Sequence, residues 1–515
     1  MKTTPRRSGP AVDAVVAAAL GALQTLAYVH TAVPGAWLLP LATLAWLVWR
    51  LDAAAPRRAA LLAACYATAW LAAGVWWLFI SMHRYGGLPA WMAALAVLAL
   101  SAALSGWLAA AAAAYARWRR DRASDALLFA ALWLLAEVAR GVVFTGFPWL
   151  AAGYSQLDAP LAALAPWLGV YGMGAVLAFA AAALARLASR RGRGWGPAAA
   201  AAVVLALGAW AGPMEHSRPA GELTVALLQT NVKQDEKFAA EHMPETLAWV
   251  GRELLAARAD LVLAPETAVP LLPFQLAEFA PGYWDTLRAH FAEPGAGRAA
   301  LVGVPLGDFD RGYTNSVAGL SAAAEYRYDK VHLVPFGEFI PTGFRWFTTL
   351  MNIPLGDFAR GVVDPPSFAA AGQRVAPNIC YEDLFGEELA RRFADAATAP
   401  TVLANLSNIG WFGDTIATTQ HLNISRLRAM EFQRPMIRAT NTGATAIIDH
   451  RGRLLAMLAP HSRGVLGGRV QGRDGITPFA WWAARAGLWP LVALALLVVA
   501  AGVLRRRAGA RPGRP

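Results

Sequence analysis

The sequence contains two cysteines, and their surroundings differ. Cys380 lies in a polar segment, residues 378–383, whereas Cys65 lies in an apolar run, where a thiol packs as a small hydrophobic side chain. A cysteine can act as a nucleophile when a base takes its proton and nearby donors stabilise the oxyanion formed after attack. Cys380 is therefore the candidate nucleophile, and a disulfide with Cys65 is not expected.

Glu266 is the candidate base. It directly follows the apolar run 261–265, so a strand there would place its carboxylate at the end of a sheet. Partial burial raises the pKa of a carboxylate toward neutrality, which would let Glu266 accept the thiol proton. The alternative is a carboxylate that caps a following helix.

Lysine is rare in this chain: arginine supplies every basic residue except Lys2, Lys233, Lys237 and Lys330. An ammonium at position 330 can donate to a developing oxyanion in a way that a guanidinium does not reproduce. The alternative is a lysine in a solvated turn after Asp329. With Cys380 and Glu266, Lys330 would complete a set of nucleophile, base and oxyanion donor.

Three further residues have candidate supporting roles. Glu338 would orient Lys330 or an incoming amine, the backbone N–H of Tyr381 would be a second oxyanion donor, and Glu382 would hold the loop that carries Cys380. The alternatives are an ordinary loop hydrogen bond for Glu338 and a surface carboxylate for Glu382. The sequence has no Gly-x-Ser-x-Gly, phosphate-loop or His-Glu-x-x-His motif, so neither a cofactor nor a metal is expected.

The elements that would position these residues are short β-rich runs and amphipathic helices beginning near Glu222. Their pattern predicts an α/β or α+β domain in which candidate residues follow the ends of strands. The predicted helices are 236–258 and 420–433, and the predicted strands are 223–228, 261–264, 300–304, 316–320, 375–379, 401–406 and 445–449.

The rest of the chain predicts a membrane domain. Of the 515 residues, 57% are hydrophobic and 16% are charged, and the mean hydropathy is +0.38, which is too apolar for a soluble protein of this length. Eight apolar runs approach the length needed to cross a bilayer: 12–29, 33–49, 59–80, 90–115, 126–144, 167–187, 195–211 and 487–504. Glu137 and Arg140 lie three residues apart in one of them and are expected to pair.

The distribution of arginine predicts the orientation, because cytoplasmic loops carry the excess of positive charge. Basic residues gather before the first run, after every second run and at the C-terminus. Both termini are therefore expected in the cytoplasm, with residues 1–212 as seven helices, 213–476 as an outward-facing domain and 477–515 as the last helix and tail. Membrane topology also explains the net charge of +12 and the isoelectric point near 10.1 better than nucleic-acid binding does.

Taken together, three segments resemble the Glu-Lys-Cys triad of the nitrilase superfamily: 265–266, 328–338 and 379–382. Predicted membrane helices precede and follow the α/β domain, and this combination restricts the resemblance to one family within the superfamily. The chain resembles the apolipoprotein N-acyltransferases, a family of bacterial inner-membrane enzymes. The resemblance covers nearly the full length and includes the supporting segments 145–149, 229–231, 408–414 and 434–443.

The resemblance implies an αββα sandwich carried by about eight membrane helices, with the sandwich on the periplasmic side. It implies that Glu266 is the base, that Lys330 stabilises the oxyanion and that Cys380 is the nucleophile, with Glu338, Tyr381 and Glu382 in support. It further implies that Cys380 takes an acyl chain from a phospholipid, with phosphatidylethanolamine expected, as a thioester. The acceptor would be the α-amino group of the diacylglyceryl-modified N-terminal cysteine of an apolipoprotein.

Aromatic residues in the outward domain are candidates for contact with lipid, because exposed aromatic side chains anchor at membrane interfaces. The candidates are Phe344, Trp346, Phe347 and Trp411, together with the stretch 271–274 and its neighbours Tyr283 and Trp284. Ordinary core packing is the alternative for these side chains.

Two other functions remain open. A membrane-tethered amidase that hydrolyses a small amide would use the same triad and the same thioester, and dry apolar surroundings of Cys380 would favour transfer over hydrolysis. A transporter or sensor with a degenerate outer domain is the non-catalytic alternative. It is disfavoured because the triad is intact and because the helices lack the polar breaks of a transporter.

Overall fold

The computed structural model describes residues 9–188, 195–211, 214–293, 295, 297–323, 325–341, 343 and 358–509. The chain divides into two compact units. One unit consists of Met1–Phe79, Ala90–Met214 and Leu488–Pro515, and the other of Ile80–Pro89 and Glu215–Gly487.

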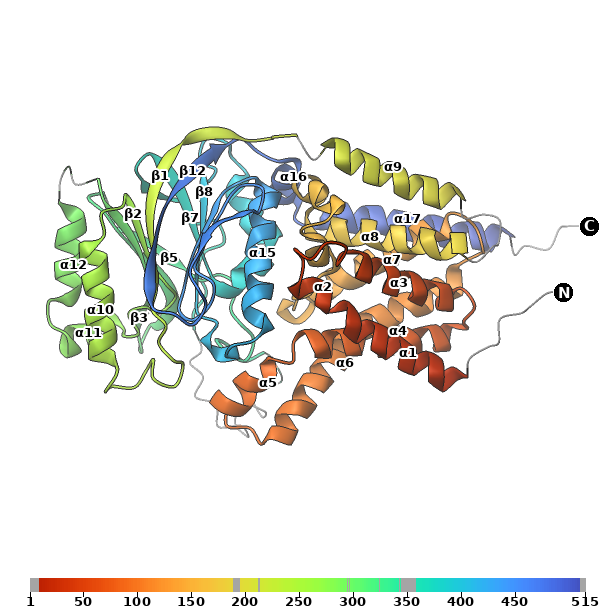
Figure 1. Cartoon of the computed structure of the whole chain (residues 1–515), viewed down its shortest axis with the longest axis horizontal. Helices are drawn as coiled ribbons and strands as arrows, with labels where there is room; N and C mark the ends of the chain where they lie inside the picture. Colours follow the sequence, from red (N-terminus) through yellow and green to blue (C-terminus); the bar gives the residue numbers. More distant parts are fainter. Residues whose placement is uncertain are drawn as a thin grey trace, which may run out of the picture. The chain divides into compact units, whose positions relative to one another are not determined.

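The first unit is helical (Figure 1). Its described helices fall in the predicted apolar runs: α1 (Pro10–Gln24), α2 (Leu26–Val29), α3 (Leu38–Leu51), α4 (Pro56–Gly74), α6 (Ala90–Trp118), α7 (Asp125–Val142), α8 (Ala165–Ala188), α9 (Trp195–Ala211) and α17 (Trp489–Gly509). Four spans among the described residues are long and apolar enough to cross a membrane, and two bent helix pairs raise this number to six.

The number of spans differs from the predicted eight because two helices are short. α3 has 14 residues and α9 has 17, whereas a membrane crossing usually takes about 20. The spans nevertheless indicate a membrane protein.

Glu137 and Arg140 form the predicted pair in α7, with Arg140 Nη2 3.6 Å from Glu137 Oε1 and both side chains fully buried. Arg140 also donates to the carbonyl oxygens of Phe147 (2.8 Å) and Trp149 (2.7 Å), and Glu137 accepts from the N–H of Ala152 (2.8 Å). The pair therefore supplies hydrogen-bond partners to the irregular backbone after α7, which has no water to bind inside a helical bundle.

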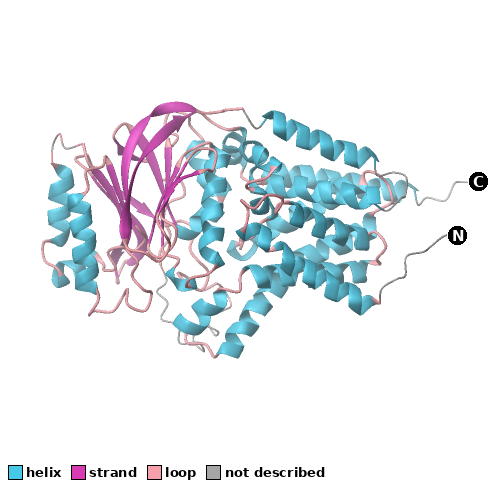
Figure 2. Ribbon diagram, in the orientation of Figure 1, coloured by secondary structure: helices cyan, strands magenta, loops and turns pink. Residues whose placement is uncertain are grey.

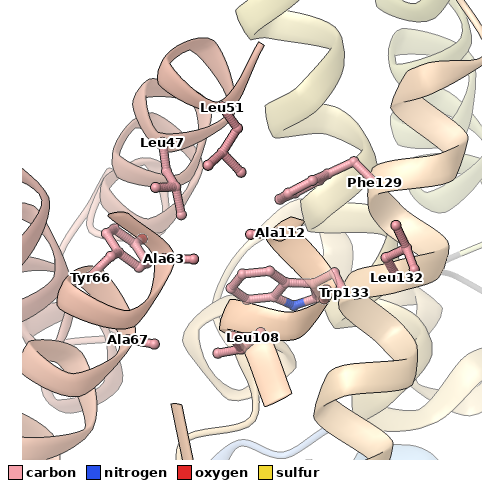
Figure 3. A pocket seen from close by; sticks show the side chains of 11 residues that line it. Leu47, Leu51, Ala63, Tyr66, Ala67, Leu108, Ala112, Phe129, Leu132 and Trp133 are labelled. Carbon is pink, nitrogen blue, oxygen red and sulfur yellow. The ribbon is translucent and has the colours of Figure 1, made fainter. Parts of the chain in front are cut away.

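Helices α3, α4, α6 and α7 enclose a small apolar gap (Figure 3). The gap has a volume of about 10 Å³, which is roughly the minimum that holds one water molecule. Its lining includes Leu47, Leu51, Tyr66, Ala67, Leu108, Ala112, Phe129, Leu132 and Trp133. The four helices are therefore closely packed at this level.

The second unit contains two six-stranded sheets among its described residues (Figure 2). The first has the order β12-β1-β2-β3-β4-β5 and the second the order β11-β10-β9-β8-β7-β6. Strands of the first sheet are β1 (Arg218–Gln229), β2 (Leu261–Ala264), β3 (Ala299–Asp308), β4 (Gly312–Leu320), β5 (Tyr326–Asp329) and β12 (Gly464–Asp474). Strands of the second are β6 (Phe368–Ala370), β7 (Gln373–Ile379), β8 (Val402–Ser407), β9 (Met436–Thr440), β10 (Ala446–Ile448) and β11 (Leu454–Met457).

Three apolar clusters hold this unit together as four layers. One cluster joins the facing sides of the two sheets through residues such as Leu263, Val375 and Ile437. A second packs α10 (Met243–Ala256), α11 (Pro273–Phe279) and α12 (Tyr283–Ala292) on the outer face of the first sheet, and a third packs α15 (Ile416–Phe432) and α16 (Pro478–Ala486) on the second (Figure 1). The predicted αββα sandwich is confirmed.

All seven predicted strands coincide with observed ones, whereas β5, β6, β9, β11 and β12 were not predicted, and one helix starts later than expected. The sequence predicted a helix over 236–258, whereas α10 begins at Met243 with Pro244 in its first turn, a position that suits proline. Strand β12 was missed because its four glycines weaken the sequence signal of a strand.

Candidate active site

The three candidate catalytic residues follow strands from both sheets. Glu266 lies two residues after β2 and Lys330 directly after β5, both in the first sheet, while Cys380 directly follows β7 of the second sheet. The sandwich therefore brings residues that are 64 and 50 positions apart in the sequence to one place, where the two sheets end.

Lys330 is almost completely buried and is paired with two carboxylates. Its Nζ lies 2.8 Å from Glu338 Oε1 and 3.4 Å from Glu266 Oε1. Burial alone would lower the pKa of Lys330, but the carboxylates of Glu338 and Glu266 outweigh burial and hold it above its ordinary value. Lys330 therefore remains an ammonium that can donate to a developing negative charge.

Asn315 of β4 links the same two carboxylates. Its Nδ2 donates to Glu266 Oε1 and to Glu338 Oε1, each at 2.7 Å. The other oxygen of Glu266, Oε2, accepts from the backbone N–H of Asn408 at 2.7 Å. These bonds fix the plane of the Glu266 carboxylate.

Cys380 has a backbone conformation that is unusual for a residue other than glycine, with φ at 49°. Burial raises the pKa of its thiol, and the nearby Glu266 carboxylate raises it further, while Lys330 and the Asn408 N–H oppose the rise only in part. The resting side chain is therefore a thiol, which needs a base during attack. Glu266 is the carboxylate that acts most strongly on it.

Glu382 joins the loop of Cys380 to the loop of Lys330. It accepts from the Tyr328 hydroxyl (2.6 Å) and from the backbone N–H of Ile379 (2.6 Å), and also from the N–H groups of Val331 (2.7 Å) and His332 (3.2 Å). A single buried carboxylate thus connects the ends of strands β5 and β7. Tyr381, the next candidate, is buried with its ring against His332 and Phe385.

A second lysine also lies at the site. Lys237 is buried and its Nζ donates to the backbone oxygen of Glu266 at 2.9 Å. Burial lowers the pKa of Lys237 to about 8, against the attraction of Glu266 and Cys380. Its charge therefore changes within the range in which enzymes work.

The candidate lipid-facing residues have different outcomes. Trp411 is 40% exposed and meets the ring of Tyr85 edge-on at 5.7 Å, whereas Phe344, Trp346 and Phe347 lie outside the described residues. In the other stretch, Leu272 is buried, and Leu271, Tyr283 and Trp284 are half-buried and pack against the apolar cluster on the outer face of the first sheet, as expected for the alternative of core packing. Phe274 is exposed.

Sequence reasoning gave no role to Asn315, His421 or Lys237, and it included Asn408 only as part of the supporting segment 408–414. The rarity of lysine, which pointed to Lys330, was a signal for Lys237 as well. The amides and His421 gave no comparable signal, because their partners are distant in the sequence. Among the described residues, no group of three or more His, Cys, Asp or Glu side chains could hold a metal ion.

Comparisons with known proteins agree with this architecture. The family model described as apolipoprotein N-acyltransferase N-terminal domain matches residues 20–183, and that described as carbon-nitrogen hydrolase matches residues 224–474. A protein named apolipoprotein N-acyltransferase from Verminephrobacter eiseniae is 54% identical over 88% of this chain and 89% of its own length. One of the same name from Ralstonia nicotianae is 46% identical over 96% of this chain and 94% of its own length. The chain therefore belongs to the apolipoprotein N-acyltransferase family, within the nitrilase superfamily.

Proposed function

We propose that this enzyme transfers an acyl chain from a phospholipid, with phosphatidylethanolamine as the expected donor, to the α-amino group of the diacylglyceryl-modified N-terminal cysteine of apolipoproteins. The family supports lipoprotein N-acylation in general. The observation that carries the proposal is the convergence of Glu266, Lys330 and Cys380 at the ends of strands in a chain with membrane-length helices.

In the first half-reaction, Glu266 takes the proton of the Cys380 thiol as sulfur attacks the ester carbonyl of the phospholipid. The resulting oxyanion is stabilised by the ammonium of Lys330 and by the backbone N–H of Tyr381. The carbon–oxygen bond then breaks, the leaving alkoxide takes the proton from Glu266, and the lysophospholipid departs. Cys380 is left as a thioester.

In the second half-reaction, the apolipoprotein amine attacks the thioester. Its proton passes to the Glu266 carboxylate, the carbon–sulfur bond breaks, and the Cys380 thiolate recovers the proton from Glu266. Glu338 holds Lys330 in place through both half-reactions by its 2.8 Å contact, and Glu382 keeps the two loops together.

The proposed location follows from the positions of the basic residues. Residues 1–212 and 477–515 would lie in the inner membrane with both termini in the cytoplasm, and residues 213–476 would face the periplasm. This orientation suits two lipid-anchored substrates, because Trp411 and the other candidate lipid-facing residues Phe344, Trp346 and Phe347 belong to the same outward segment.

Mass spectrometry of the purified protein after incubation with phosphatidylethanolamine tests the proposal. We expect a fatty-acyl mass on Cys380 that disappears when a diacylglyceryl peptide with a free amine is added. The adduct should be absent in Cys380→Ala and present in Cys65→Ala, which removes the other thiol. Absence of an adduct in wild type, together with hydrolysis of small amides, would favour the tethered amidase instead.

A further inference from the structure

We propose that His421, held by Arg438, is a positioning residue that aims the backbone N–H of Tyr381 at the oxyanion. The inference rests on the proposed thioester chemistry at Cys380, and it adds a role for two buried side chains, His421 and Arg438, that do not touch the substrate.

Two buried side chains donate to the carbonyl oxygen of Cys380. His421 Nε2, from α15, lies 3.1 Å from this oxygen, and Asn405 Nδ2, from β8, lies 3.3 Å from it. The side chains of His421 and Asn405 have no exposed surface. The carbonyl is therefore held from two different elements of the second half of the sandwich.

Arg438 determines which nitrogen of His421 carries the proton. Arg438 Nη2 lies 3.1 Å from His421 Nδ1, and a guanidinium can only donate. Nδ1 must therefore accept, so the hydrogen of the neutral ring is on Nε2 and is directed to the Cys380 carbonyl. Burial, together with the charge of Arg438, holds the pKa of His421 well below its ordinary value, so the ring stays neutral.

Arg438 is itself fixed in place. Its Nη1 lies 3.3 Å from Asp383 Oδ2 and also donates to the Ser425 hydroxyl, which in turn donates to Asp383. Asp383 is three residues from Cys380. The hydrogen bonds that run from the Cys380 carbonyl through His421 and Arg438 to Asp383 therefore return to the same loop. These side chains are fully buried.

The carbonyl of Cys380 and the N–H of Tyr381 belong to one peptide group. All peptide bonds between described residues are trans, and in a planar trans peptide the C=O and N–H point in opposite directions. Fixing the carbonyl toward His421 and Asn405 therefore fixes the N–H toward the other side, where the oxyanion forms. The left-handed φ of Cys380, 49°, is a conformation that persists only when its surroundings determine it.

The same hydrogen bonds also make the backbone N–H of Tyr381 a stronger donor. Hydrogen bonds that run in one direction polarise one another, and here they run from the guanidinium of Arg438 through His421 and the Cys380 carbonyl to the Tyr381 N–H. The buried positive charge thus acts on the oxyanion without any transfer of a proton.

The experiment compares two reactions of Cys380 in a Cys65→Ala protein, so that only one thiol is present. Alkylation by iodoacetamide displaces iodide and forms no oxyanion. Addition of the thiol across the carbonyl of a long-chain aldehyde gives a hemithioacetal whose oxygen occupies the oxyanion position. The aldehyde concentration that halves the alkylation rate measures the oxyanion site without any phospholipid.

We expect that alkylation of His421→Phe is halved only at an aldehyde concentration at least about ten times that needed for wild type. The variant should also form the thioester with phosphatidylethanolamine about 10 to 100 times more slowly, which is a smaller effect than removing one oxyanion donor completely. Alkylation without aldehyde should stay within about threefold of wild type, because it depends on the thiol and not on the oxyanion donors. His421→Gln keeps one acceptor and one donor at the ring positions and should restore most of both losses.

Gln373→Met is the matched control. Gln373 is a buried side chain at the opposite end of β7 that donates to the Ala220 carbonyl at 2.8 Å, and its loss should leave both reactions unchanged. If His421→Phe does not fold, Asn405→Ala should still weaken aldehyde binding. It removes the second carbonyl donor together with the hydrogen bond of the same nitrogen to Asn378 Oδ1.

Unchanged aldehyde binding in the folded variants would overturn the inference. So would a parallel fall of alkylation and aldehyde binding, which would mean that the thiol itself is misplaced. If wild type forms no thioester with phospholipid, the proposed function fails, while the aldehyde comparison still decides the role of His421.

Discussion

The ammonium nitrogen of Lys330 lies 2.8 Å from Glu338 Oε1. This contact is shorter than the 3.4 Å contact of the same nitrogen with Glu266. Glu338 is therefore the main partner of Lys330 in the resting enzyme, and the two oxygens of Glu266 accept from Asn315 and Asn408. In the proposed mechanism the same Glu266 carboxylate takes the thiol proton.

Replacing Glu338 by glutamine should slow thioester formation by about 10- to 100-fold, the range expected for loss of one well-placed group. Loss of this carboxylate lowers the pKa of Lys330 and draws its ammonium toward Glu266, where it weakens the base. The rate of acyl-enzyme formation measured by mass spectrometry checks this. Glu245→Gln removes an exposed carboxylate paired with Arg463 and should leave the rate unchanged; an equal loss in both variants would refute the role of Glu338.

Asn315 is expected to be as sensitive as the charged residues around it. Asn315→Leu removes the donor shared by Glu266 and Glu338 and should lower the acylation rate by about tenfold or more, whereas Asn315→Asp should lower it further because it adds a third carboxylate beside two others. The single-turnover rate with phosphatidylethanolamine decides the order. A faster reaction with aspartate than with leucine would show that the side chain acts by shape alone.

Lys237 predicts a specific dependence on pH. Its pKa is about 8 in the folded protein, so it is an ammonium below that pH and neutral above it. As the pH rises through 8, its attraction for the Glu266 carboxylate and for a developing Cys380 thiolate is lost. The acylation rate of wild type should therefore lose part of its value above about pH 8.

Two variants test this dependence. Lys237→Arg stays charged and should carry the rate to higher pH, whereas Lys237→Met should lack the inflection and be slower at neutral pH. The measurement is the acylation rate from pH 6 to 10 in each protein. An unchanged inflection in Lys237→Met would assign it to another group.

Glu382 should matter for stability as well as for catalysis. Glu382→Gln turns an amide donor toward backbone N–H groups that need an acceptor, at a cost of about 2 kcal/mol. Tyr328→Phe removes one of the four bonds and should cost about 1 kcal/mol. Denaturant unfolding in detergent compares them, and equal losses would mean that the backbone bonds to Glu382 contribute little.

The strands that carry Glu266 and Cys380 were predicted from the sequence because a buried strand appears there as an apolar run that is followed by a polar residue. The sequence did not predict how Asn315 or Asn408 contact Glu266, because those bonds join residues 49 and 142 positions apart and depend on how two sheets align. The late start of α10 and the shortness of α3 were not predicted, because apolar content alone does not determine the residue at which a helix begins or ends.

The first sheet ends in Glu266 and Lys330, and the second ends in Cys380. Each sheet is hydrogen-bonded within itself, and the two sheets share an apolar core that includes Leu263 and Val375. Hydrogen bonds such as those of Gln373 with Ala220 and of Glu382 with Tyr328 add polar links between them. Neither sheet alone holds all three of the proposed catalytic residues. Enzymatic activity consequently depends on how the two sheets are aligned with each other. A substitution that loosens their common core should abolish activity before either sheet unfolds.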